Sequence, residues 1–197
     1  MEIDRGILVN DHLQTNIKDV YAVGDCAQVR NPRTGRRNIE AVWYTGRMMG
    51  EVAAYKICDH LTTYDPGIWF NSAKFLDIEY QVYGDIATQM PAHMDTLYWE
   101  HEDGEKSIRL VFKKNSFEVV GFNLMGIRFR HEVCEKWIRE KCQVEEVLRD
   151  LALASFDPEF FPPYHQKVIE TYNQQFNKSI SIHTKRRFNL VSKFLNQ

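Results

Sequence analysis

The residues with the clearest chemical potential lie near the N-terminus, where a glycine and an aspartate follow an apolar run. Gly24 and Asp25 come directly after residues 20–23 and are followed by Cys26. Glycine lets the backbone approach a bulky ligand closely, and the Asp25 carboxylate accepts hydrogen bonds from the hydroxyls of a polyol. A Gly-Asp pair by itself more often ends a strand with a turn, so the residues around it must decide between the two interpretations.

Those surrounding residues fill a longer pattern. From Thr15 onward there are four residues, the apolar Val20-Tyr21, then Ala22, one variable residue and Gly-Asp, and a strand-like run at residues 6–9 precedes them. This stretch resembles the second flavin-binding motif of the pyridine nucleotide-disulfide oxidoreductases, in the branch of the nitrite, rubredoxin and ferredoxin reductases. The resemblance implies FAD as cofactor and NAD(P)H as substrate of the parent protein. It also implies that Asp25 binds the ribityl chain, with Gly24 and Cys26 beside it.

The same family places a helix after this motif, with the helix N-terminus near the pyrimidine edge of the flavin. The sequence predicts a helix over residues 41–59, and its first turn would be Ala41, Val42 and Trp43. A helix N-terminus stabilises negative charge and would favour the anionic reduced flavin. The Trp-x-x-Gly from Trp43 to Gly46 resembles the nitrite and rubredoxin reductase branch, although a tryptophan more often serves packing than chemistry.

Small residues repeat along this predicted helix. Gly46, Gly50 and Ala54 are spaced by four, so they fall on one stripe. Each glycine costs about 1 kcal/mol relative to alanine in a helix. We therefore expect the stripe to approach a sheet or the cofactor closely.

The elements around the motif indicate an α+β fold. Residues 6–9 and 20–23 are continuous apolar runs typical of buried parallel strands, and residues 62–71 contain Pro66-Gly67 and predict a linker. Beyond the linker an antiparallel meander and then helices are expected, with strands at 73–83, 95–101, 107–113 and 117–124, and helices at 131–141, 144–154 and 164–177.

Turn signals separate the later strands, at Asp103-Gly104 and Asn115-Ser116. Residues 70–86 resemble the opening of the C-terminal domain of the same reductase branch. We therefore expect two domains. Residues 1–61 would be the end of an FAD-binding α/β domain, and residues 70–197 a C-terminal α+β domain of the dimerisation or interface type.

Composition and charge exclude several functional classes. The net charge of −2 gives no field for nucleic acid or acidic lipid, and no apolar run reaches the roughly 20 residues of a membrane helix. Lys185-Arg186-Arg187, the one basic cluster, is expected to be a solvated tail. The four cysteines form no CxxC pair and fit reduced thiols in the cytoplasm. His131, Cys134 and Cys142 lack a fourth ligand at zinc spacing, so no metal is expected.

The sequence lacks some motifs that the resemblance requires. It contains no GxGxxG, and therefore neither the ADP part of an FAD site nor an NAD site. We expect Met1 to be an internal start, with N-terminal FAD- and NAD-binding domains as partners, and this chain alone to be inactive. A homo-oligomer is also expected. Two alternatives stay open, a non-catalytic dimerisation or partner-docking module and an independent protein that binds a small ligand.

Overall fold

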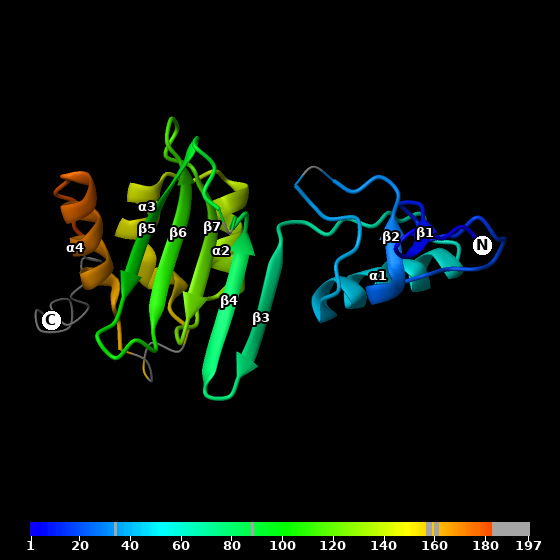
Figure 1. The fold of residues 1–197 in the computed structure, drawn as a ribbon, viewed down its shortest axis with the longest axis horizontal. Helices are drawn as coiled ribbons and strands as arrows, with labels where there is room; N and C mark the ends of the chain where they lie inside the picture. Colours follow the sequence, from blue (N-terminus) through cyan, green and yellow to red (C-terminus); the bar gives the residue numbers. More distant parts are fainter. Residues whose placement is uncertain (34, 88, 157–158, 160–161, 183–197) are drawn as a thin grey trace, which may run out of the picture.

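The computed structural model describes residues 1–33, 35–87, 89–156, 159 and 162–182. The elements form two groups, which lie side by side and are joined by an extended segment (Figure 1). We call residues 1–61 the N-terminal unit and residues 70–182 the C-terminal unit. The buried apolar side chains form two clusters, one in each unit. The basic cluster Lys185-Arg186-Arg187 lies outside the described residues.

The N-terminal unit contains a small parallel sheet and one long helix. Its elements are β1 (Ile7–Val9), the 3-10 turn η1 (Gly24–Cys26), β2 (Ala27–Val29) and α1 (Trp43–Ile57). β1 and β2 pair in parallel, with Ile7 opposite Ala27. The helix packs on this pair through a core made of Val9, Leu13, Ala22, Ala27, Val29, Met49 and Ala53.

The strand predicted at residues 20–23 is wrong. Tyr21 forms only an isolated bridge with Gln14, and the strand that pairs with β1 is β2, which lies after the Gly-Asp pair. The segment before η1 folds back on itself, since the Thr15 N–H donates to the Val20 carbonyl and the Ala22 N–H to the Leu13 carbonyl. These local bonds use the backbone groups that a ladder with β1 would need.

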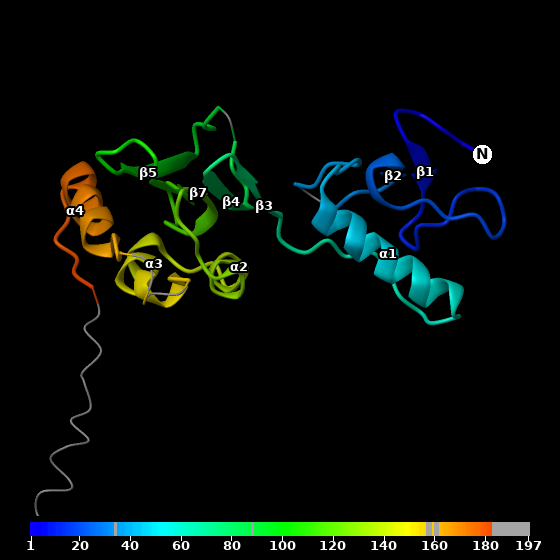
Figure 2. The same ribbon diagram turned by 90° about the horizontal axis from the view of Figure 1, so that it is seen from below.

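The C-terminal unit is an antiparallel sheet with helices on one face (Figure 2). The strand order is β3-β4-β7-β6-β5. The strands are β3 (Phe70–Phe75), β4 (Ile78–Gly84), β5 (Met94–Glu100), β6 (Ser107–Lys113) and β7 (Val119–Met125), and the helical elements are α2 (His131–Arg139), α3 (Val144–Arg149), η2 (Leu151–Ala154) and α4 (His165–Phe176). The fold class is therefore α+β, as predicted.

Two details of the predicted sheet are wrong. The single strand expected at residues 73–83 is the hairpin of β3 and β4, which turns at Leu76, a residue with a positive φ of 51°. The sheet is antiparallel but not a simple meander, because β4 pairs with β7 rather than with β5. Both differences depend on long-range pairing, which an alternating pattern within one strand does not encode.

The alternation within β6 follows the prediction. Ile108, Leu110 and Phe112 are buried beneath the helices, while Arg109 and Lys113 are half-exposed. In α3 and η2 the apolar residues Val144, Val147, Leu148 and Leu151 are all fully buried. Among the described residues, no helix is long and apolar enough to cross a membrane.

Candidate functional site

Gly24 lies at the point where the N-terminal unit brings its turn and its helix together. Its φ is +74°, a left-handed conformation that favours glycine. A Cβ added to Gly24 would meet no atom within 4 Å, so this side of the backbone is open. On another side the helix is close, since a Cβ on Gly46 would lie 3.5 Å from Gly24 Cα. The positive φ therefore accounts for glycine at position 24, whereas a Cβ at Gly46 would make an ordinary van der Waals contact with η1.

Met49 connects α1 to η1. From the sequence we expect this residue to be partly uncovered in the present chain, and that expectation is wrong. It is fully buried, and its Sδ accepts a hydrogen bond of 3.3 Å from the Gly24 N–H. Met49 lies one helical turn after Gly46, so the two residues share a face of α1. That spacing is the signal that could have found it.

The close approach expected of the whole small stripe is wrong beyond Gly46. A Cβ on Gly50 would meet nothing within 4 Å, and Ala54 is exposed. Within the described part of the chain, Gly46 is the one position of this stripe that lies close to another element.

Asp25 and Cys26 both point to the surface of η1. Both side chains are exposed, and the Cys26 thiol donates to the Val23 carbonyl at 3.4 Å. Among the residues that the structure describes, none forms a hydrogen bond or ion pair with the Asp25 carboxylate. Two carboxylate oxygens beside an open glycine are thus available as acceptors for ligand hydroxyls.

The start of α1 is the third part of the site. The helix begins at Trp43, so Val42 is its N-cap and Ala41 precedes it, which corrects the expected first turn. Val42 makes no side-chain cap, and the first N–H groups of a helix have no partner within the helix. Trp43 is 69% exposed, with the Arg47 guanidinium 5.8 Å from its ring centroid. The helix N-terminus is therefore open to an anionic or polar group.

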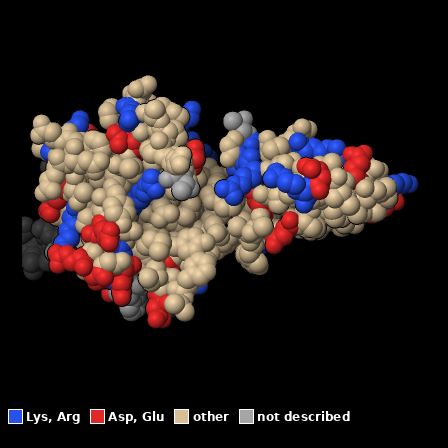
Figure 3. Space-filling model, viewed as in Figure 1, with Lys and Arg blue, Asp and Glu red and all other residues tan. Residues whose placement is uncertain are grey.

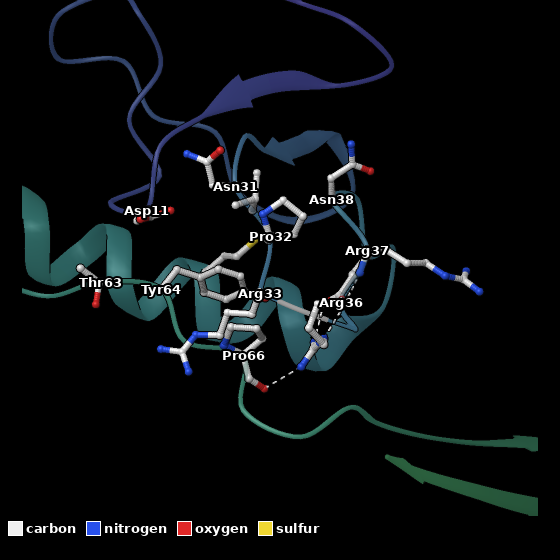
Figure 4. Close-up of a pocket in the computed structure, with 13 residues that line it drawn as sticks. Asp11, Asn31, Pro32, Arg33, Arg36, Arg37, Asn38, Thr63, Tyr64 and Pro66 are labelled. Atoms are coloured by element: carbon white, nitrogen blue, oxygen red, sulfur yellow. Dashed lines mark hydrogen bonds and ion pairs between the residues drawn. The ribbon is translucent and has the colours of Figure 1, made fainter. Parts of the chain in front are cut away.

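Met49 also contributes to the lining of a small cavity in the N-terminal half of the chain (Figure 4). Its volume is about 140 Å³, and it is bounded by the loop before α1 and by residues 63–66. The Tyr64 hydroxyl has no hydrogen-bond partner among the described residues. Burial, and then the nearby Glu40 carboxylate, raise the pKa of Tyr64 to about 12, so the hydroxyl stays a neutral donor.

Cys134 and His131, two of the residues considered as metal ligands, lie in packed surroundings. Cys134 is buried in the core of the C-terminal unit, and this burial raises the pKa of its thiol. His131 lies against the Phe70 ring at 4.3 Å and near the Glu135 carboxylate at 3.7 Å. Within the described ranges, no three His, Cys, Asp or Glu side chains are arranged to hold a metal ion.

Comparison with known proteins gives the same family for the part of the chain that holds the site. Residues 1–50 match the family model described as pyridine nucleotide-disulphide oxidoreductase. The NADH-rubredoxin oxidoreductase of Clostridium acetobutylicum is 30% identical over 132 residues, which cover 66% of this chain and 32% of the relative. An NADH oxidase of Streptococcus pneumoniae is 27% identical over 177 residues, 80% of this chain and 38% of that protein.

Solved structures share the fold. The NAD-dependent persulfide reductase from A. fulgidus superposes with a TM-score of 0.62 at 20% identity, covering 92% of this chain and 37% of that one. A CoADR-RHD protein of Bacillus anthracis gives 0.59 at 21% identity, covering 85% and 33%. This chain spans about a third of the length of the curated relatives that it matches.

Proposed function

The chain belongs to the pyridine nucleotide-disulphide oxidoreductase family, and we propose that its N-terminal unit completes the FAD site of a larger NAD(P)H oxidoreductase. FAD and NAD(P)H are the cofactors of this family. One observation carries the proposal. Gly24 has a positive φ, is open on one side and lies beside Gly46 in the first turn of α1. The Asp25 carboxylate, which has no partner among the described residues, is therefore held near the uncapped start of α1.

The residues present fit the flavin in three ways. Asp25 would accept hydrogen bonds from the ribityl hydroxyls, with the backbone of Gly24 and Cys26 beside it. The backbone from Ala41 to Trp43 would face the pyrimidine edge, where the positive end of α1 stabilises negative charge. When bound, FAD supplies the chemistry of accepting a hydride from NAD(P)H.

On this proposal, the 197-residue chain works together with further segments that bind FAD and NAD(P)H, and the matched relatives are long enough to hold such segments. The absence of a glycine-rich phosphate loop in the sequence supports this. The chain alone would then bind no NAD(P)H and would not turn it over. The acceptor named for a relative, rubredoxin, is a property of that relative.

We expect Asp25→Ala to weaken FAD retention in the parent protein. A hydrogen bond to a charged group contributes about 1.5–3 kcal/mol, which is on the order of a tenfold to hundredfold loss of affinity. The measurement is the ratio of FAD to protein after dialysis.

Two further variants sharpen this test. Asp25→Asn keeps an acceptor but removes the charge, so its FAD content should fall between wild type and Asp25→Ala. Glu51→Gln removes an exposed carboxylate elsewhere on the N-terminal unit and should change nothing. An FAD content that is equal in all four proteins would show that Asp25 only ends a turn.

We also propose that this chain self-associates through its N-terminal unit. The sheet there has only two strands of three residues each, which is marginal in water. Val20, Val23 and Trp43 leave apolar surface exposed, and a second copy is a low-cost way to cover it. Light scattering during size exclusion should show a dimer for the whole chain and a monomer for a shortened chain that begins at Gly67.

A docking role for the C-terminal unit is the second candidate function. The tip of the β3–β4 hairpin supports it, because Leu76 is 94% exposed and Phe75 beside it is also exposed. If the whole and the shortened chain dimerise equally, the association surface lies on the C-terminal unit, and this tip is the candidate for it. A monomer in both cases would contradict self-association altogether.

A further inference from the structure

We propose that Arg36 is a positioning residue that holds the linker and the C-terminal unit in a fixed relation to the start of α1. The segment from residue 30 to residue 42 connects β2 to α1 and carries several arginines. Figure 3 shows Lys and Arg atoms gathered on the side of the N-terminal unit that faces the C-terminal unit. Arg36 differs from the others because its side chain is buried, at 8% exposure.

The Arg36 guanidinium binds two parts of the chain at once (Figure 4). Its Nε and Nη2 donate to Glu40 Oε1 and Oε2 at 2.7 and 2.5 Å, a two-pronged pair with a carboxylate that is itself 5% exposed. Its Nη1 donates to the carbonyls of Pro66 and Gly67 at 3.1 and 2.7 Å. The guanidinium carbon also lies 5.4 Å from the centre of the Trp69 ring. One side chain therefore joins the loop before α1 to the linker after it.

Glu40 transmits this connection to the helix. Its backbone carbonyl accepts a hydrogen bond from Thr45 Oγ1 at 2.8 Å, and the same hydroxyl lies 2.9 Å from the Val42 carbonyl. Thr45 is in the first turn of α1. Apart from the exposed bond to the Gly67 carbonyl, the path from the linker to Arg36, Glu40 and Thr45 consists of buried or half-buried hydrogen bonds, which water screens little.

A second attachment lies on the preceding residue of the same turn. The Tyr44 hydroxyl is 2.8 Å from Ser72 Oγ in β3, and the Tyr44 ring lies 4.6 Å from the Phe70 ring. A single contact would leave the two units free to rotate about it. Two contacts, one to the linker and one to the first strand of the sheet, fix the orientation of the C-terminal unit relative to α1.

A general stabilising role does not account for the geometry of Arg36. Arg47 and Glu51 also pair at i,i+4 spacing, but they are 63% and 58% exposed, and such pairs contribute little. Burying both Arg36 and Glu40 costs desolvation that a well-packed apolar pair would avoid. The ion pair instead fixes the relative orientation of its partners, because the planar guanidinium binds one carboxylate and two carbonyls at set angles.

The positioning role has a consequence that rests on the proposed function. If the start of α1 faces the flavin, Arg36 sets the distance between that helix N-terminus and the C-terminal unit. If the contacts of Arg36 were weakened, the first turn of α1 would be free to move. This movement would change the electrostatic stabilisation of the reduced flavin.

The test uses the whole chain and does not require FAD. In Arg36→Lys the charge remains but the fork is lost, so we expect chymotrypsin to cleave the linker after Tyr64 or Trp69 about tenfold faster or more. Amide relaxation should show that the two units tumble together in wild type and separately in the variant. Arg47→Lys is the matched control and should change neither readout. Unchanged cleavage and tumbling in Arg36→Lys, or an equal effect of Arg47→Lys, would overturn the proposal.

A double variant covers the case in which Arg36→Lys fails to fold. Arg36→Met with Glu40→Leu leaves no unpaired buried charge, so the amide spectrum of each unit should persist while the units tumble separately. If the two units still tumble together in the double variant, the positioning role of Arg36 is refuted. In the parent protein, the reduction potential of FAD should shift in Arg36→Lys. An unchanged potential with uncoupled units would overturn the flavin part alone, whereas the Asp25 variants decide the flavin site itself.

Discussion

Replacing Gly84 by alanine is expected to destabilise the C-terminal unit by about 2–5 kcal/mol, the sum of two effects. Gly84 ends β4 with a φ of +66°, which costs an L-residue about 1–2 kcal/mol. In addition, a Cβ there would lie 2.1 Å from the Val120 carbonyl oxygen and 2.9 Å from Ile138 Cδ1. The carbonyl oxygen belongs to β7, which pairs with β4, so it cannot move without breaking the ladder. Overpacking of this kind costs about 1–3 kcal/mol more.

Urea unfolding followed by tryptophan fluorescence measures this loss. Gly104→Ala is the matched control, because Gly104 also has a positive φ, of 71°, but its Cβ would meet only the end of the Glu100 side chain at 3.9 Å. It isolates the backbone cost of about 1–2 kcal/mol. If Gly84→Ala and Gly104→Ala lower the free energy of unfolding equally, the contact with β7 has no energetic weight.

Met49→Ala is expected to unfold the N-terminal unit while the C-terminal unit stays folded. Removing a buried methionine side chain costs about 2–5 kcal/mol, and here the whole core consists of seven buried apolar residues. The Gly24 N–H would also lose its acceptor. A unit of about 60 residues has only a few kcal/mol of stability from its core, so the loss is comparable with the total.

Amide spectra distinguish the two units directly. We expect the resonances of residues 1–57 to collapse in Met49→Ala, while those of β5, β6 and β7 keep their positions. Met48→Ala is the control, since the neighbouring Met48 is half-exposed and lies outside this core. Equal spectra for the two variants, or a loss of the β6 resonances in Met49→Ala, would contradict the separation of the two clusters.

The parts of the fold that the sequence predicted depend on local information. The turn at Asp103-Gly104 and the alternation of Ile108, Leu110 and Phe112 require only short-range geometry. Two helices of the C-terminal unit, α2 and α4, follow from apolar spacing and lie within two residues of their predicted ends, whereas the single helix expected at residues 144–154 is divided into α3 and the 3-10 turn η2. The Gly24-Asp25 pair was found for the same reason, because its defining residues are consecutive.

The parts that were missed depend on which segments meet. Residues 20–23 read as a strand, yet their hydrogen bonds go to their own loop, and β2 takes the place beside β1. The pairing of Arg36 with Glu40 has helical spacing but lies in an irregular loop, where spacing says nothing about contact. Its further partners at Pro66 and Gly67 are 30 and 31 residues away, beyond the reach of any local pattern.

The division of the buried residues into two clusters also bears on how the sequence can drift. Neither cluster contains a residue of the other, so substitutions inside one core place no packing constraint on the second. The two units are therefore free to diverge at different rates. Tyr44 is an exception, because it contacts Ser72 and Phe70 across the junction, and Arg36 is another, because it binds the linker. Among homologues we expect Tyr44 and Ser72 to change together, and a loss of Arg36 to be accompanied by a changed linker.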